Sequence, residues 1–164
     1  MIRVLVSACL LGEKVRYNGA DAATGSRILE EWLAERRVVP FCPEVAGGLG
    51  VPRPAAEILG PGGGSVLDGA GRVVTREGAD VTEAFLRGAE LAWQTARAHD
   101  VRLAVLKEGS PSCGSGFVYD GSFSGRRTPG SGVTAALLER RGIRVFSEVR
   151  LEAAAAYLRE LEGR

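Results

Sequence analysis

Three cysteines, each following an apolar segment of the chain, are the residues best suited to do chemistry. Cys9 follows Ile2–Ala8, Cys42 follows Val38–Phe41, and Cys113 follows Val101–Leu106. Glycine and proline on both sides of Cys113 indicate a backbone that turns sharply and approaches another group closely. Thiolates bind zinc and iron, so three converging thiols would form a metal or iron–sulfur site. Thiolates exposed at such a site would have low pKa values and would oxidise readily in air.

Other interpretations of the cysteines are weaker. An isolated cysteine is often a small buried hydrophobic residue, but here turn-forming residues follow each one. An odd number of cysteines does not make a secreted disulfide framework. A structural zinc site has four ligands, usually in close pairs, and the chain has no C-x-x-C pair. Its single histidine, His99, ends a predicted helix and is expected at the opposite edge of the sheet.

The composition is typical of a soluble globular protein. The chain has 164 residues, of which 45% are hydrophobic and 25% charged, with a formal net charge of +1. That length fits a single α/β domain spanning residues 1–164. The charge gives no indication of a DNA or membrane partner. Because Met1 leads directly into a predicted strand, without a signal peptide, we expect a cytoplasmic protein. The sequence makes no prediction of oligomeric state.

Strands and helices alternate along the chain. Apolar runs predict strands at Ile2–Ala8, Val38–Phe41, Val101–Leu106 and Ile143–Phe146. Helical spacing predicts helices at Ser26–Arg37, Asp80–Asp100, Val133–Arg141 and Leu151–Leu161. This alternation predicts a three-layer α/β fold of the Rossmann-like or flavodoxin-like type, with a mainly parallel four-stranded sheet.

Two segments depart from the alternation. Residues 56–75 contain three short β-like pieces, the middle one at Ser65–Leu67, and predict a β-hairpin-like antiparallel insertion. Residues 116–132 are too rich in glycine for a regular element, so a loop is expected there. Both segments could close over a bound ligand.

The expected strand order brings the cysteines together. If the four strands lie in the order two-one-three-four, the three that precede a cysteine are adjacent. Right-handed crossovers put their carboxyl ends at one edge of the sheet. Open α/β sheets bind ligands at this edge, where the strand order reverses. We therefore expect the three thiols to share one site.

The motifs around the cysteines resemble those of a bacterial family long catalogued as a domain of unknown function, some of whose members are thiouracil desulfidases. The resemblance runs from about residue 2 to residue 148, and its motifs are Val6–Gly12, Val15–Gly19, Pro40–Leu49, Pro52–Arg53, Gly78–Thr82, Leu106–Gly114 and Tyr119–Gly121. It implies a four-iron four-sulfur (4Fe-4S) cluster bound by Cys9, Cys42 and Cys113. The open iron would take the sulfur of a small thiolated pyrimidine of the 2- or 4-thiouracil type, and hydrolysis would release it as hydrosulfide.

The resemblance also implies a glutamate and a serine in catalysis. These are Glu44 and one of Ser110 and Ser112. Glu44 could deprotonate water or relay a proton, although an acid after Cys42-Pro43 could simply cap a helix. Either serine could donate to a developing oxyanion or could cap a turn.

Three cationic residues are candidates for substrate binding, namely Arg16, Arg53 and Lys107. Solvated surface positions are the alternative for all three.

Two other functions are consistent with parts of this pattern. A non-catalytic iron–sulfur or metal-binding module would need the thiolates but no acid–base groups, so Glu44 and the serines favour an enzyme. A nucleotide-binding α/β domain would carry a G-x-G-x-x-G motif after the first strand, and Ser7–Gly12 lacks it.

Overall fold

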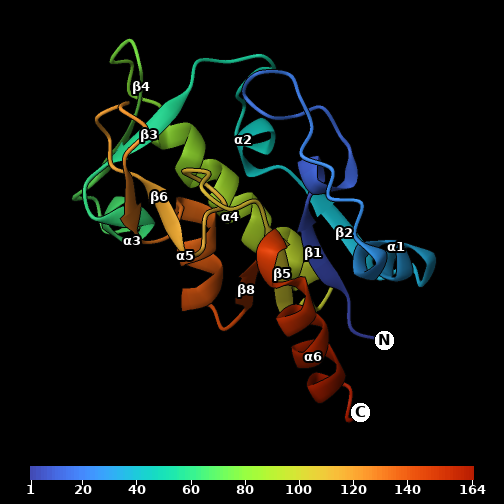
Figure 1. Ribbon diagram of the computed structural model, residues 1–164. Coiled ribbons are helices and arrows are strands. Elements are labelled where there is room, and N and C mark those ends of the chain that lie inside the picture. The colour runs from blue at the N-terminus through green and yellow to red at the C-terminus, as the bar shows by residue number, and fades with distance from the viewer.

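The computed structural model describes residues 1–164, and its centre is a four-stranded parallel sheet (Figure 1). The strands are β1 (Val4–Ser7), β2 (Val38–Phe41), β5 (Leu103–Leu106) and β8 (Arg144–Ser147). Their order is β2-β1-β5-β8, and every neighbouring pair is parallel. The predicted strand order and α/β class are therefore confirmed.

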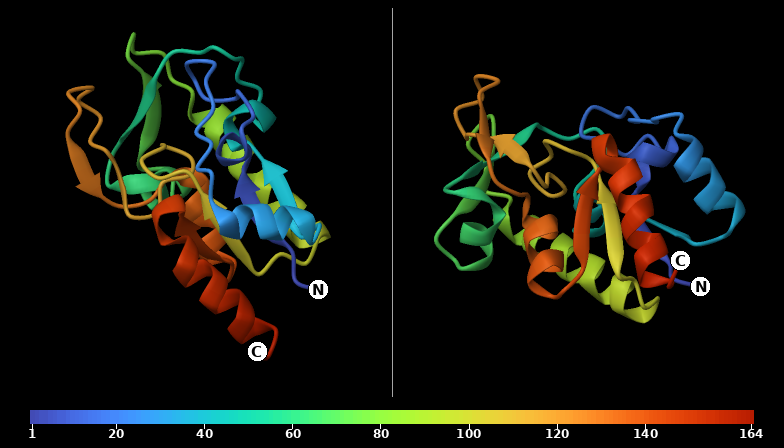
Figure 2. Two further views of the ribbon diagram at one scale, coloured as in Figure 1. Left: turned by 45° about the vertical axis from the view of Figure 1, so that its right-hand side comes forward. Right: turned by 60° about the horizontal axis from the view of Figure 1, so that its bottom comes forward.

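Helices cover both faces of this sheet (Figure 2). They are α1 (Arg27–Ala34), α4 (Thr82–Ala98), α5 (Val133–Arg140) and α6 (Leu151–Leu161). Val4 and Val6 of β1 pack with residues of α1 and α6, whereas Leu5 packs with residues of α4 and α5. This alternation follows from the pleat of a strand, whose successive side chains point to opposite faces.

A two-stranded antiparallel sheet lies beside the main sheet. It pairs β3 (Ala56–Leu59) with β4 (Arg72–Thr75), as the insertion predicted. The predicted strand at Ser65–Leu67 is wrong, because this segment belongs to helix α3 (Gly62–Leu67). The glycines give α3 a low intrinsic helix propensity. Tertiary packing overrides it: Val66 is buried in a core cluster, and Gly63 lies so close to Gly132 that a Cβ atom would stand 2.3 Å from its carbonyl oxygen.

A second antiparallel pair occupies the segment expected to be a loop. Strand β6 (Phe117–Tyr119) pairs with β7 (Arg127–Pro129). Val118 of β6 is buried in the same core cluster as Ile58 of β3. This contact joins segments that are distant in the sequence, which explains why local composition did not reveal the strands.

Short helical turns follow the carboxyl ends of three strands. They are the 3-10 turn η1 (Ala8–Leu11) after β1, α2 (Pro43–Ala46) after β2, and the 3-10 turn η2 (Glu148–Arg150) after β8. Cys9 is in η1, and Cys42 is the N-cap of α2. No helix combines the length and the apolar character that a membrane crossing requires.

Candidate active site

A cavity of about 430 Å³ opens at the carboxyl edge of the sheet. All nine residues singled out from the sequence line it: Cys9, Arg16, Cys42, Glu44, Arg53, Lys107, Ser110, Ser112 and Cys113. His99 caps the end of α4 instead, where its Nδ1 lies 2.9 Å from Nη1 of Arg3. The structure thus brings together every candidate from the sequence and leaves the histidine outside.

The three cysteines are free thiols in three different surroundings. The pKa of Cys42 is raised by burial and lowered in part by backbone N–H groups of Val45 and Glu44, at the start of α2. Cys9 has cationic neighbours, Lys107 and Arg16, which act to lower its pKa.

Hydroxyl groups surround the third thiol. Ser7 and Ser112 each donate to Cys113 Sγ, at 3.5 Å. Ser7 Oγ also accepts a hydrogen bond from the backbone N–H of Lys107 at 3.0 Å, so the hydroxyl proton of Ser7 is directed to the sulfur. Each thiol therefore has its own means of stabilising a negative charge: cations for Cys9, backbone N–H groups for Cys42, and hydroxyls for Cys113.

Burial keeps these thiols protonated in the free protein. It raises the pKa of Cys113 to about 12, and burial together with the nearby Cys42 raises the pKa of Cys9 to about 11. The expectation of low-pKa thiolates is therefore wrong for the free protein, because Cys9 and Cys113 are buried rather than exposed. Since a thiol must lose its proton to become a ligand, cluster binding has to release protons here.

The donor set fits an iron–sulfur cluster better than a single ion. No three or more histidine, cysteine, aspartate or glutamate side chains are arranged to hold one metal ion. The three thiols nevertheless line one cavity and form no disulfide. Cysteine thiolates are the usual ligands of iron–sulfur clusters. A larger, multi-iron group suits thiols that share a cavity without converging on one point.

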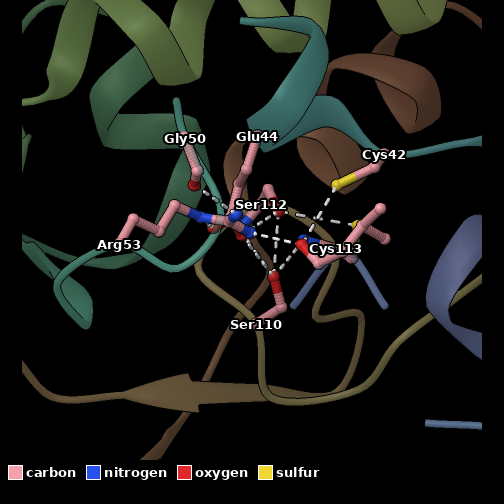
Figure 3. Close-up of polar contacts among 8 residues, drawn as sticks. Cys42, Glu44, Gly50, Arg53, Ser110, Ser112 and Cys113 are labelled. Atoms are coloured by element: carbon pink, nitrogen blue, oxygen red, sulfur yellow. Dashed lines mark hydrogen bonds and ion pairs between the residues drawn. The ribbon is translucent and has the colours of Figure 1, made fainter. Parts of the chain in front are cut away.

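Glu44 is held at the centre of a polar network (Figure 3). Its Oε2 accepts from Ser112 Oγ at 2.8 Å and from Ser110 Oγ at 3.3 Å, and Arg53 Nε donates to its Oε1 at 3.0 Å. The Glu44 and Arg53 side chains are 14% and 7% exposed, so water competes little for these contacts. Glu44 lies in the first turn of α2, but its carboxylate points to the serines rather than capping that helix.

The two serines differ in their contacts. Ser110 Oγ accepts from the backbone N–H groups of Ser112 and Cys113, at 3.1 and 3.2 Å, and thus shapes the turn before the cysteine. Ser112 is almost fully buried and makes the shorter contact with Glu44. The hydroxyls of the two serines lie 2.9 Å apart. The turn-capping role considered for Ser110 is therefore present, alongside its contact with the carboxylate.

Arg53 makes several contacts within the protein. Besides Glu44, it donates to the carbonyl oxygens of Gly50 and Val15, each at 2.9 Å. All three nitrogens of its guanidinium group therefore have protein partners. Lys107 is engaged as well, because its Nζ lies 3.1 Å from Oε2 of Glu148.

Sequence reasoning missed Ser7 and Glu108. Ser7 is buried and donates to Cys113, which lies 106 positions away in the chain, so no local pattern could reveal the contact. Glu108 accepts from backbone N–H groups on both sides of the cysteine turn, at Gly109, Ser115, Gly116 and Phe117. Its position next to Lys107 in the glycine-rich turn was the available signal.

We expect Glu108→Gln to weaken this turn and to change the pH dependence of stability. Burial alone would raise the pKa of Glu108, but the backbone N–H groups outweigh it and lower the pKa below its usual value of 4.5. The carboxylate therefore stabilises the fold above pH 4.5, and this contribution is lost as the pH falls through the lowered pKa. The variant should be about 1–3 kcal/mol less stable at pH 7.

Urea unfolding of the cluster-free protein from pH 7 to pH 3 measures this effect. The difference in unfolding free energy between wild type and Glu108→Gln should disappear as the pH falls below 4.5. Other carboxylates titrate equally in both proteins, so the difference isolates Glu108. An equal gap at every pH would contradict the assignment.

Part of the cavity lining, which we call the far wall, comes from the two small antiparallel sheets and the segments next to their strands. Ala56, Glu57 and Tyr119 are in the strands, whereas Ala55, Arg76, Phe123 and Gly125 flank or connect them. Of the segments expected to cover a ligand, residues 116–132 contribute Tyr119, Phe123 and Gly125 to the lining, and residues 56–75 contribute only Ala56 and Glu57.

The comparisons with known proteins extend over nearly the whole chain. Residues 4–150 match the 2-thiouracil desulfurase family. The chain is 48% identical over 145 residues to the uncharacterized protein YbbK of Bacillus subtilis (strain 168), covering 88% of this chain and 95% of that protein. Among solved structures, the 4Fe-4S-dependent thiouracil desulfidase TudS is similar, with a TM-score of 0.89 and 50% identity over 96% of this chain and 98% of that one.

Proposed function

Because the chain belongs to the 2-thiouracil desulfurase family, we propose that it removes sulfur from thiolated pyrimidines of the 2- or 4-thiouracil type by hydrolysis, with a 4Fe-4S cluster. One observation carries the proposal. Three free thiols line the same cavity as the Glu44 carboxylate, which accepts hydrogen bonds from two serine hydroxyls. A module that only carried a cluster would need the thiols and not the carboxylate–serine pair.

Cys9, Cys42 and Cys113 are the residues that would hold the cluster. When bound, a cluster with one iron free of protein ligands supplies a Lewis acid for the soft sulfur of a thiocarbonyl. The cations near Cys9, the N–H groups near Cys42 and the hydroxyls at Cys113 each compensate one thiolate. Such surrounding contacts orient ligands and tune the group that they hold.

Glu44 is the proposed acid–base group. Arg53 fixes one carboxylate oxygen, and the serine hydroxyls orient the other toward the cavity. Glu44 would take a proton from water as the water oxygen bonds to the ring carbon that carries sulfur. The carbon–sulfur bond then breaks, and sulfur leaves as hydrosulfide. Glu44 would return that proton to the departing sulfur, and the proton of the new C–OH group leaves as the C=O bond forms, so that a thiocarbonyl and water give a carbonyl, hydrosulfide and one proton.

Ser110 and Ser112 are proposed to hold the Glu44 carboxylate in position. They are also proposed to donate hydrogen bonds to negative charge that develops on the substrate. Each hydroxyl has one proton, which it gives to Glu44 in this structure, so donation to the substrate would require the hydroxyl to turn once Glu44 is protonated. Arg16 and Lys107 remain candidates for contact with the substrate, whereas Arg53 acts through Glu44. We also propose a cytoplasmic location, because three unpaired thiols suit a compartment where cysteines stay reduced.

Anaerobic preparation tests the proposal directly. We expect a brown protein with broad cluster absorbance, containing about four iron and four sulfide per chain, that releases hydrosulfide from 2-thiouracil or 4-thiouracil. Aerobic handling should bleach it and abolish turnover. Iron and sulfide without turnover would favour a carrier module, and their absence after anaerobic reconstitution would contradict the proposal.

A further inference from the structure

Phe123 has an unusual backbone conformation at the far wall of the cavity. Its φ angle is +57°, in the left-handed region that bulky residues rarely adopt. Only two other non-glycine residues have positive φ, Arg36 (+59°) and Asp100 (+52°), and neither lines the cavity. Strain of this type persists only where the surrounding structure enforces it, and it clusters at functional sites.

The surrounding structure does enforce it. Oε1 of Glu57, on strand β3, accepts from the backbone N–H of Gly121 at 2.9 Å and from that of Phe123 at 3.2 Å. The turn also lies tightly against β3, because a Cβ atom on Gly121 would stand 2.8 Å from the carbonyl oxygen of Ile58. Two hydrogen bonds and one close contact therefore hold the turn in place.

The ring of Phe123 is placed at the cavity rather than in the core. Phe123 is half-buried, lines the cavity and belongs to none of the three hydrophobic core clusters. The Arg76 guanidinium carbon lies 5.6 Å from the ring centroid, so a cation contacts the ring. Tyr119, the other aromatic residue of this wall, is in the regular strand β6 and packs edge-to-face on Phe117. Phe123 is thus the aromatic side chain that the fold places in the cavity at the expense of backbone strain.

We propose that Phe123 is a substrate-binding residue on whose ring the pyrimidine base stacks. This inference rests on the proposed function, because a planar heteroaromatic substrate is what an aromatic surface recognises. Stacking tolerates different positions of sulfur on the ring, since every base presents a π-face. Glu44 and the cysteines, which line the same cavity, would then act on the edge of the base.

Replacing Phe123 should raise KM and leave kcat nearly unchanged. Phe123→Ala removes the stacking surface, so KM for 2-thiouracil should rise on the order of tenfold, the worth of one base–aromatic stack. Phe123→Tyr keeps the ring and should keep KM near the wild-type value. A contact made equally in the ground and transition states acts through KM alone.

Binding and stability provide readouts that do not depend on turnover. The dissociation constant of uracil, measured by calorimetry, should rise in Phe123→Ala by a similar factor. Phe123→Gly should melt at a temperature about 2–4 °C above that of Phe123→Ala, because glycine adopts the left-handed region freely. The matched pair Arg36→Gly and Arg36→Ala, at an exposed site of similar φ, should show the same difference in melting temperature without any change in KM.

These outcomes separate this inference from the proposed function. Wild-type protein that contains the cluster but releases no hydrosulfide would contradict the proposed function. The measurement of uracil binding would still test the role of Phe123. Wild-type turnover with unchanged KM and unchanged uracil binding in Phe123→Ala overturns the stacking role alone. A rise in KM in the Arg36 variants as well would also overturn it, because the effect would then not come from the cavity.

Discussion

Glu44→Gln is expected to lower turnover by about 10²-fold or more while the iron and sulfide content stays at the wild-type level. Glutamine keeps the size of the side chain and can still accept a hydrogen bond from Arg53 through its amide oxygen. It cannot take a proton, and its NH₂ group would face the hydroxyl of Ser112, which in the wild-type protein donates to the carboxylate. The loss should appear mainly in kcat, because the missing step is a proton transfer.

Iron content, melting temperature and hydrosulfide release from both thiouracils should be measured on the same preparation. Near-normal turnover with a stability loss of about 1 kcal/mol would mean that Glu44 only supports the start of α2. Loss of the cluster in this variant would instead indicate that Glu44 is a ligand of the cluster. Glu30→Gln is the matched control, because Glu30 is also an acid in the first turn of a helix but is exposed on α1. It should leave turnover unchanged.

Gly132→Ala is expected to weaken cluster binding and to lower turnover by about 10²-fold or more. A Cβ atom at position 132 would stand 2.4 Å from the carbonyl carbon of Ser112 and 2.8 Å from the backbone nitrogen of Cys113. Both neighbours are backbone atoms, so relief requires the cysteine turn to move. The φ of Gly132 is −72°, which alanine adopts readily, so the effect comes from lost space alone.

Overpacking of this kind costs about 1–3 kcal/mol in stability. The effect on function should be larger, since a displacement of about 1 Å at a reacting centre can cost about 10²-fold in rate. Gly64→Ala is the control, because its Cβ would meet only the Nη2 atom of the exposed Arg140 side chain. Iron content, turnover and unfolding by urea should be measured on both variants. A Gly132→Ala protein with a full cluster would show that the turn tolerates the displacement.

The class of fold and the edge at which the cysteines lie could be predicted from local features of the chain. Apolar runs and helical periods are local signals, and right-handed crossovers put the carboxyl ends of the parallel strands at one edge. The observed order β2-β1-β5-β8 is the one considered from the sequence, although these signals alone do not select it. The motifs around the cysteines indicated the family and the thiouracil chemistry, because their residues are adjacent in the chain.

The partners of the site residues, in contrast, depend on how distant parts of the chain pack together. Glu44 and Ser112 are 68 positions apart, and Ser7 and Cys113 are 106 apart, so no local pattern pairs them. The pKa values of the buried thiols depend on packing in the same way, which is why low values were expected and high ones found. Segments 62–67, 117–119 and 127–129 form regular structure that their composition disfavours, because burial of Val66 and Val118 outweighs the low intrinsic propensity of glycine-rich chain.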